Sequence, residues 1–272
     1  MKKESTPYTS ATSQTATRLN KALADAGLCS RRKADELIQN GAVVVNGIVT
    51  RELGLRVLPS DTISVHGKKI IRASQSRTWL MMNKPVQIVS TAHDPEGRRT
   101  VLDILPEDWK RLRLFPVGRL DYFSEGLLLL TDDGELAHRV LHPAYQVPRV
   151  YHLLVREQPD EAILQNMRSG VCLAEGERLA PMKARILPSS ARLSYFPPYG
   201  TLLEIMLTQG VNRQIRRICR DLKLTVLRLA RVAHGAICLG DLPPGRVRLL
   251  SDVEVASLRT EKNQTRKSSS VT

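Results

Sequence analysis

The stretch GRLDYFSEGLLLLTDDGELAH, residues 118–138, combines an isolated acid with an unbroken apolar run. The four leucines at 127–130 followed by Asp-Asp-Gly predict a buried strand that ends in a turn. Asp121 stands just before that strand and two residues after Arg119. A carboxylate held at the edge of a predicted buried strand is well placed for chemistry, so this stretch is the starting point for both fold and function.

A single carboxylate has several possible uses at this position. A glycosidase requires a second carboxylate across the substrate, and a metal site requires a cluster of His or acidic ligands. Asp132, Asp133 and Glu135 belong to the predicted turn and supply neither. A nucleophilic carboxylate kept ionised by a neighbouring cation fits the pattern. A turn or helix-capping role for Asp121 fits it as well.

The composition favours a polyanionic partner. The chain of 272 residues has 41 Lys and Arg against 27 Asp and Glu, for a net charge of +14. Such an excess is typical of proteins that bind nucleic acid, and a merely basic soluble protein is the alternative. Membrane binding is disfavoured, because no basic amphipathic segment with Trp or Phe is present and no apolar run reaches about 18 residues.

The cysteines argue against a metal or disulfide framework. Cys29, Cys172, Cys219 and Cys238 are scattered and form no Cys-x-x-Cys pair. We therefore expect reduced structural thiols in a cytoplasmic protein and neither a zinc site nor a disulfide framework. The polar N-terminus lacks the apolar core of a secretory signal.

Turn and capping residues predict a small N-terminal module. Two short helices are expected over 19–40, where Gly27 ends the first and Ser30 caps the second. Asn46-Gly47 predicts a tight hairpin, and a further strand is expected to turn at His66-Gly67. The predicted divisions of the chain are a flexible arm (1–17), the module (18–71), a linker (72–77), a larger domain (78–256) and a flexible basic tail (257–272).

The larger domain is expected to mix strands with helices. WLMMNKP predicts a strand that stops at Pro85. VYHLLVRE (150–157) and TLLEIMLTQG (201–210) predict further strands, whereas EAILQNMRSG (161–170) and NRQIRRICRDLK (212–223) predict helices. The expected fold class is α+β, with a helix-helix-hairpin module ahead of a mixed, mostly antiparallel sheet with flanking helices.

Three cations open the second helix of the module. Arg31, Arg32 and Lys33 follow Ser30, where free amides already favour anions. The run makes either a phosphate-binding surface or a solvated charged face. RLNKALADAGLCSRRKADELIQNGAVVVNGIV (18–49) resembles the α-L RNA-binding motif, which implies docking on structured RNA through the two helices.

The opening stretch itself carries a second resemblance. GRLDYFSEGLLLLTDDGELAHRVLHP (118–143) closely resembles the catalytic segment of the ribosomal-RNA pseudouridine synthases that carry an α-L motif in front. In that family the catalytic acid of the GRLD string falls on Asp121. NKPVQIVSTAHDPEGRRTVLDILP (83–106) resembles the strand and loop that precede it, including the DPEGR-TV string of large-subunit members. Gln87 departs from the family, which often has Gly there.

Two later segments extend the resemblance to about residue 254. PRVYHLLV (148–155) matches the segment with the active-site tyrosine, here Tyr151, and Arg149 replaces the usual Lys. GVNRQIRRICRDLKLTVLRLARVAHGAICLGDLPPGRVRLL (210–250) matches the third segment, whose basic residue falls on Arg216. The four strings occur in the family's order, which makes the match highly specific.

The resemblance implies that the protein isomerises uridine to pseudouridine in ribosomal RNA, with the large-subunit (23S) RNA favoured. It also implies that the reaction needs no metal and no cofactor. Asp121 would start the reaction, either at the anomeric carbon or by removing a sugar proton. Tyr151 would stack on a uracil flipped out of its helix, and Arg216 would pair with Asp121 and hold it. Without the resemblance, Tyr151 would be taken as a core residue and Arg216 as a phosphate-binding one.

Further arginines are predicted to contact RNA. Arg119 would hold the flipped nucleotide or fill the vacated stack, with a structural salt bridge as the alternative. Arg213 and Arg217 would bind phosphate from the third segment. Arg98 and Arg99 would contact the RNA backbone, or simply belong to a mobile exposed loop.

The remaining polar candidates are given structural roles. His138 and His142 are predicted at helix ends, and Lys84 is predicted to be structural or to face RNA rather than to be catalytic. The rival functions are a non-catalytic ribosome-assembly protein on the same scaffold, a synthase for small-subunit rRNA, and a glycosidase of free nucleosides. We expect a monomer with structured rRNA as its partner and no membrane contact.

Overall fold

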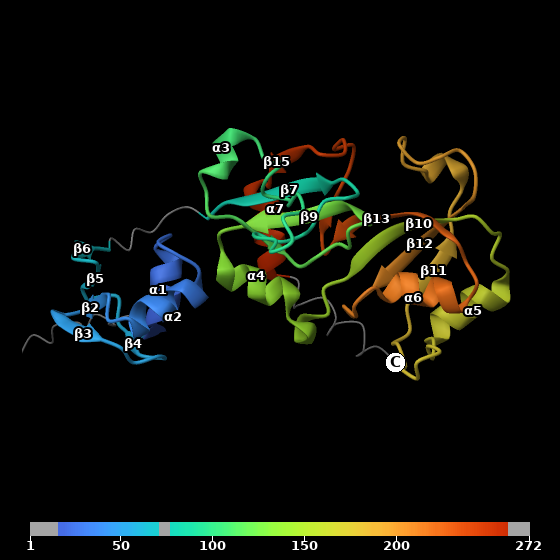
Figure 1. The fold of residues 1–272 in the computed structure, drawn as a ribbon. Coiled ribbons are helices and arrows are strands. Elements are labelled where there is room, and N and C mark those ends of the chain that lie inside the picture. Colours follow the sequence, from blue (N-terminus) through green and yellow to red (C-terminus); the bar gives the residue numbers. More distant parts are fainter. Residues whose placement is uncertain (1–15, 71–76, 261–272) are drawn as a thin grey trace, which may run out of the picture. The chain divides into compact units, whose positions relative to one another are not determined.

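The computed structural model describes residues 16–70 and 77–260. The chain divides into two compact units, Met1–Ser76 and Arg77–Thr272, which are considered separately (Figure 1). The division falls within the predicted linker. Residues 1–15, 71–76 and 261–272 lie outside the described residues, and they contain most of the predicted arm (1–17), linker (72–77) and tail (257–272).

Two predicted boundaries need correction. Thr17, assigned to the arm, pairs with Val57 in a two-stranded sheet. Residues 257–260, assigned to the tail, close helix α7 (Asp252–Thr260). Both segments are ordered because they supply contacts to a folded unit: Leu258, for example, is 4% exposed and packs in the core of the second unit.

The first unit contains two helices and small antiparallel sheets around one apolar core. Leu23, Ala34 and Ile38 are fully buried at its centre, as helical spacing of the apolar residues predicts. The sheet of four strands has the order β3-β2-β5-β6, and β1 pairs with β4. The elements are α1 (Leu19–Asp25), α2 (Arg31–Gln39), β1 (Thr17–Arg18), β2 (Val43–Val45), β3 (Ile48–Thr50), β4 (Arg56–Val57), β5 (Ile63–Val65) and β6 (Lys68–Lys69).

The predicted local signals of this unit are confirmed. The Ser30 hydroxyl accepts a hydrogen bond from the Lys33 amide at 3.2 Å and caps α2. Asn46 and Gly47 have φ values of 51° and 84°, as a tight hairpin with positive φ at both central residues requires. Each signal acts within three residues, so tertiary contacts do not have to specify it.

The second unit is built on a nine-stranded sheet, which confirms the α+β class. The order is β11-β12-β10-β13-β9-β7-β15, with β14 beside β13 and β8 beside β9, and only β13 and β9 run parallel. The strands are β7 (Trp79–Lys84), β8 (Phe115–Val117), β9 (Glu125–Thr131), β10 (Arg149–Val155), β11 (Lys183–Ile186), β12 (Thr201–Leu207), β13 (Val226–His234), β14 (Ile237–Cys238) and β15 (Val247–Leu249).

Helices cover this sheet in two groups (Figure 1). One core contains residues of α4 and α7 packed on β7 and β9, and another contains residues of α5 and α6 packed on β10, β12 and β13. The helices of the second unit are α3 (Glu107–Lys110), α4 (Gly134–Leu141), η1 (Pro143–Tyr145), α5 (Glu161–Ser169), η2 (Ser189–Ala191), α6 (Gln214–Asp221) and α7 (Asp252–Thr260).

The leucine run is explained by burial on both faces. In β9, Leu127 and Leu129 pack with α4 and α7, whereas Leu128 and Leu130 pack on the opposite face against the segment 88–120. A strand covered on both sides has no need of polar alternation, which is why four consecutive leucines are accommodated.

The Asp-Asp-Gly sequence after β9 is a helix start rather than only a turn. The Asp133 carboxylate accepts a hydrogen bond from the Leu136 amide at 3.0 Å and caps α4. His142 follows the last residue of the same helix, and His138 lies in its last turn. The prediction that both histidines lie at a helix end is confirmed.

A close backbone approach joins the two halves of the sheet. The parallel pairing of β9 with β13 spans only two residue pairs, one of which is Gly126 with Arg231. A Cβ atom at Gly126 would lie 2.3 Å from the Arg231 carbonyl oxygen, and the φ of Gly126 is +96°. Glycine is required here on both counts. The joint brings the Asp121 turn, just before β9, beside the middle of β13.

Candidate functional site

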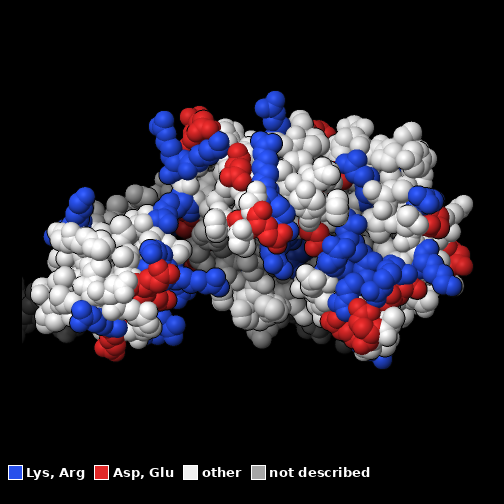
Figure 2. Space-filling view, in the orientation of Figure 1, with Lys and Arg blue, Asp and Glu red and all other residues white. Residues whose placement is uncertain are grey.

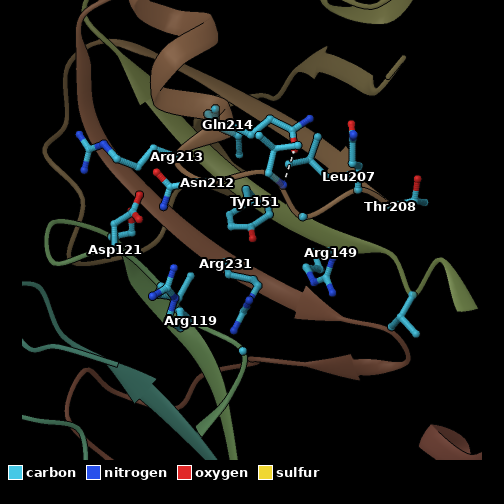
Figure 3. A pocket seen from close by; sticks show the side chains of 18 of the residues that line it. Arg119, Asp121, Arg149, Tyr151, Leu207, Thr208, Asn212, Arg213, Gln214 and Arg231 are labelled. Atoms are coloured by element: carbon cyan, nitrogen blue, oxygen red, sulfur yellow. Dashed lines mark hydrogen bonds between the residues drawn. The ribbon is translucent and has the colours of Figure 1, made fainter. Parts of the chain in front are cut away.

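A cavity of about 810 Å³ opens in the second unit. Its walls come from the Asp121 turn, the segment after α4, strands β10 and β13, and the loop that leads into α6 (Figure 3). The volume is in the range of sites that enclose a small molecule or one nucleotide. The predicted site residues that line it are Arg119, Asp121, Tyr151, Arg213 and Arg216.

Asp121 and Arg216 form an ion pair at one wall of the cavity. The Arg216 Nε atom lies 3.8 Å from Asp121 Oδ2, and the side chains are 17% and 27% exposed. Arg216 Nη2 also donates to the carbonyl oxygen of Phe123 at 2.7 Å and to the Ser124 hydroxyl at 3.2 Å. One guanidinium therefore holds both the carboxylate and the turn that carries it.

Burial weakens the hydration of this arginine without removing its charge. Desolvation lowers the pKa of Arg216, and the nearby Asp121 carboxylate partly opposes that shift. Because the ordinary pKa of a guanidinium is far above neutral pH, Arg216 remains a cation at pH 7. Its attraction to Asp121 is stronger in this partly water-excluded position than it would be on an open surface.

Lys84 supports the same turn from inside the protein. Its side chain is fully buried, and Nζ donates to the carbonyl oxygens of Ser124 at 2.8 Å, Pro85 at 2.9 Å and Asp121 at 3.3 Å. Burial lowers the pKa of Lys84 to about 8. The structural role predicted for this lysine is confirmed, and the RNA-facing alternative is wrong because its ammonium group is enclosed.

The loop after β7 braces the turn from a second side. The Ser90 hydroxyl donates to the Leu120 carbonyl oxygen at 2.9 Å, and the backbone N–H of Gln87 donates to the Tyr122 carbonyl oxygen at 2.6 Å. Gln87 has a φ of 62°, in the left-handed region that favours glycine. The loop thus keeps a glycine-like conformation at the position where the sequence departs from the family pattern.

Tyr151 lies in the middle of β10, half-buried, with its ring in the cavity wall (Figure 3). Its cross-strand neighbours are Ile205 on β12 and Arg231 on β13. Because the strand on each side fixes its backbone, the ring presents a rigid apolar surface beside the Asp121–Arg216 pair. A flat aromatic surface of this kind suits stacking on a nucleobase.

Arg119 and Arg213 border the cavity with exposed side chains. Arg119 precedes Asp121 by two residues, and Arg213 adopts a φ of 49° where the loop enters α6. Both can reach a polyanion in the cavity without first leaving a carboxylate partner in the described part of the chain.

Three other predicted RNA contacts lie away from the cavity. Arg217 pairs with Glu175 at 2.8 Å and with Glu177 at 2.6 Å, so it fastens a neighbouring loop to α6. Arg98 makes a two-pronged contact with the buried Asp94 carboxylate and closes its own loop. Arg99 is exposed beside it.

The cations of the first unit form a separate surface. Arg31, Arg32 and Lys33 are exposed at the start of α2, and Lys33 pairs with Glu36 at 2.7 Å. Arg31 also borders a shallow hollow of about 350 Å³, together with Arg18, Lys21 and Arg56. This unit therefore presents a cationic face of its own.

Sequence reasoning missed Arg231, Asn212 and Gln214, which all line the cavity. Arg231 is 2% exposed in the middle of β13. Leu229 lies two residues earlier, also in the cavity wall, so strand alternation predicts an apolar residue at 231. A charged side chain at an inward strand position was the signal that could have revealed it.

The charge distribution agrees with a polyanionic ligand. Figure 2 shows Lys and Arg side chains gathered over the α6 region, with a group of acids beside them.

No group of three or more His, Cys, Asp or Glu side chains with metal-binding spacing occurs in residues 16–70 and 77–260. Within those ranges, no helix combines the length and apolar character needed to cross a membrane.

Comparison with known proteins identifies the class to which this fold and site belong. Residues 78–221 match the family model of RNA pseudouridylate synthases, and residues 17–63 match that of the S4 domain. An uncharacterized RNA pseudouridine synthase of Aquifex aeolicus is 40% identical over 243 residues, which cover 89% of this chain and 93% of the relative.

Two further similarities extend over most of the chain. Ribosomal large subunit pseudouridine synthase B of Bacillus subtilis is 38% identical over 245 residues, covering 89% of this chain and 95% of the relative. A crystal structure of a pseudouridylate synthase superposes with a TM-score of 0.62 at 25% identity, over 89% of this chain and 99% of the other. The chain belongs to the RNA pseudouridylate synthase family and is an RNA-modifying enzyme with an S4 domain in front.

Proposed function

We propose that this enzyme isomerises one or more uridines of large-subunit (23S) ribosomal RNA, with Asp121 as the catalytic carboxylate. The observation that carries the assignment is the Asp121–Arg216 pair at 3.8 Å, in the same cavity as Tyr151. The choice of RNA is supported by the relative from Bacillus subtilis, which is named for the large ribosomal subunit. With rRNA as substrate, the enzyme would act in the cytoplasm, and we propose that it acts as a monomer.

The proposed reaction conserves all atoms of the uridine. The bond from the sugar C1′ to the base N1 breaks, the base turns, and C1′ joins C5, while the C5 proton is lost and N1 gains one. The uracil leaves the RNA stack to enter the cavity, which costs a few kcal/mol. Tyr151 stacks on the extruded base, Arg216 keeps the Asp121 carboxylate in place, and Asp121 starts the chemistry at the sugar.

Replacing Asp121 by Asn tests the assignment, because it removes the carboxylate and keeps its shape. Transcribed 23S rRNA is incubated with the protein, and pseudouridines are mapped chemically. The Asp121→Asn variant should form no product while binding the RNA within a few-fold of wild type. Asp108→Asn, on the exposed face of α3, is the matched control and should retain full activity.

Two outcomes would contradict the proposal in different ways. Product formation by Asp121→Asn would show that another group starts the reaction. A wild-type protein that modifies small-subunit rRNA but leaves 23S rRNA unchanged would refute the choice of substrate alone. The map of pseudouridines in cells that lack this protein identifies the uridine itself.

A further inference from the structure

Besides the Asp121–Arg216 pair and the exposed Arg119 and Arg213, the cavity is lined by two less exposed arginines that have no carboxylate partner among the described residues. Arg149 and Arg231 both line it, on the adjacent strands β10 and β13. Arg231 is directly opposite Tyr151 in the strand register, and Arg149 lies two residues before Tyr151 on the same strand face. Within residues 16–70 and 77–260, neither guanidinium has a carboxylate partner.

Arg231 is incompletely satisfied although it is 2% exposed. Its Nε atom donates to the Leu127 carbonyl oxygen at 2.7 Å, which fixes the side chain against β9. Its Nη2 atom is buried and has no hydrogen-bond partner. A buried cationic donor without an acceptor is costly, so a ligand that supplies the acceptor would be stabilised at this position.

The surroundings of these arginines raise the cost further. Burial and the charge of Arg231 both lower the pKa of Arg149. His234 is the cross-strand partner of Arg149, and both of its ring nitrogens are buried without partners. Burial and the two arginines lower the pKa of His234 well below its usual value, so it is neutral. The cluster offers donors and positive potential and contains no acid.

We propose that Arg149 and Arg231 bind a phosphate of the RNA chain, next to the nucleotide whose base stacks on Tyr151. This inference rests on the proposed function and adds a second recognition point to the same cavity. Two guanidinium groups match the geometry and the charge of a phosphodiester, whereas a neutral uracil carbonyl would accept a hydrogen bond and leave the charge unbalanced. Figure 3 shows Arg149, Tyr151 and Arg231 around the same hollow.

The physical role of this phosphate site is positioning. The phosphate and the base are the two ends of a nucleotide, so binding both fixes the sugar between them. The sugar then faces Asp121 in a single orientation, and the entropic cost of orienting it is met when the RNA binds. Arg149 and Arg231 act through the position of the sugar and do not touch the reacting atoms.

The first experiment compares uridine 5′-monophosphate with uridine, using the full-length protein and calorimetric or NMR titration. Wild type should bind the monophosphate at least about tenfold more tightly than the nucleoside, as expected for a charge-assisted contact. Arg149→Gln should remove most of that difference and leave uridine binding unchanged. Lys183→Gln makes the same charge change at an exposed position on β11 and should have no effect on either ligand.

The second experiment locates the phosphate in a real substrate. A synthetic RNA hairpin with the mapped target uridine is prepared with a neutral methylphosphonate at each flanking position in turn. At one position the substitution should weaken binding to wild type about tenfold and have little effect on Arg149→Gln. Arg231→Lys, which keeps a charge in the core, should show the same loss of discrimination if the guanidinium fork is needed.

Several outcomes would overturn the phosphate site. They are equal affinity of wild type for uridine and its monophosphate, wild-type behaviour of Arg149→Gln, or an equal loss for Arg149→Gln on charged and neutralised RNA at every position. The last result would mean that Arg149 does not act through a phosphate next to the target nucleotide. Failure of wild type to form pseudouridine would refute the proposed function, whereas the titration with the monophosphate would still decide the site.

Discussion

The Asp121–Arg216 end of the cavity and the Arg149–Arg231 end use the same cation in opposite ways. At the first, the guanidinium has a carboxylate 3.8 Å away and two further acceptors on the turn. At the second, neither Arg149 nor Arg231 has a carboxylate partner within residues 16–70 and 77–260, whereas a buried guanidinium nitrogen without a hydrogen bond occurs at both ends, Nε of Arg216 and Nη2 of Arg231. The paired arginine organises protein, and the unpaired ones are available to a ligand.

The same distinction separates neighbouring residues of one helix. Arg216 and Arg217 are adjacent in α6, yet the guanidinium of Arg217 forms ion pairs with Glu175 and Glu177. The hydrogen bond to Glu177, followed by the one to Glu175, raises the pKa of Arg217. Burial lowers the pKa of Arg216. A count of basic residues therefore overstates the surface available to RNA, because tertiary ion pairs occupy part of it.

Replacing Arg216 should give the largest effect after loss of Asp121 itself. Arg216→Gln removes the cation that holds the carboxylate, and we expect turnover to fall about 10³-fold, as for other electrostatic catalytic contacts. Arg217→Gln, the neighbouring control, should stay within about threefold of wild type because it breaks only the two surface ion pairs with Glu175 and Glu177. Single-turnover pseudouridine formation measures both, and equal losses would remove the distinction between the two arginines.

Gly126→Ala should disrupt the close backbone approach of β9 and β13, which joins the two halves of the sheet. Its Cβ atom would lie 2.3 Å from the Arg231 carbonyl oxygen at a φ of +96°, so the backbones must separate. We expect the free energy of unfolding of the second unit to fall by about 3 kcal/mol.

The effect of Gly126→Ala on the free energy of unfolding can be measured for the second unit alone. The two tryptophans, Trp79 and Trp109, both belong to the second unit, so their fluorescence in urea reports it selectively. Gly134→Ala is the control, since a Cβ atom there meets nothing within 4 Å. A variant at 126 as stable as this control would show that the close approach is not required.

Lys84, which supports the Asp121 turn, should make the free energy of unfolding of the second unit depend on pH. Its folded pKa of about 8 is below the ordinary 10.5, so the folded state binds fewer protons than the unfolded state between these values. Unfolding then takes up a proton, and stability rises with pH across this window by at most about 1.4 kcal/mol per unit. Below pH 8 the buried charge persists and the gain is absent.

The measurement compares wild type with Lys84→Met by urea unfolding at several pH values. The difference between the two free energies of unfolding isolates the lysine from other titrating groups. It should grow in favour of wild type from about pH 8 to pH 10. A difference that stays constant with pH would mean that Lys84 keeps an ordinary pKa in the folded protein.

Gln87→Gly should have the smallest effect and the opposite sign. Gln87 has a φ of 62°, which costs a non-glycine residue about 1 kcal/mol that glycine avoids. We expect the second unit to gain up to about 1 kcal/mol, reduced by the greater freedom of glycine in the unfolded chain. Gln165→Gly, in the middle of α5, should instead destabilise by a similar amount. A loss of stability at 87 would show that its side chain contributes to the loop.

Local signals carried the parts of this structure that were predictable. Ser30 caps α2 and Asn46-Gly47 turns the first hairpin, because each acts on backbone groups within three residues. The segments with Asp121, Tyr151 and Arg216 were recognisable as strings, and the structure brings these three residues into one cavity. Their catalytic roles are what the Asp121→Asn and Arg216→Gln variants test.

Distant pairings decided the remainder. Lys84 reaches the Asp121 turn across 37 positions of sequence, and Arg231 reaches the Leu127 carbonyl across 104. Leu258 was placed in a flexible tail because nothing nearby in sequence reveals the core that receives it.

The amino-acid sequence by itself determined the Ser30 helix cap, the Asn46-Gly47 turn and several of the long strands and helices of the second unit. These depend on steric and hydrogen-bonding rules that act over a few residues. Tertiary structure alone decided which arginines are neutralised and which remain open to RNA. An ion pair forms only where strand register and helix packing bring a carboxylate within about 4 Å of the cation. A run of basic residues in the sequence does not reveal which carboxylates come that close.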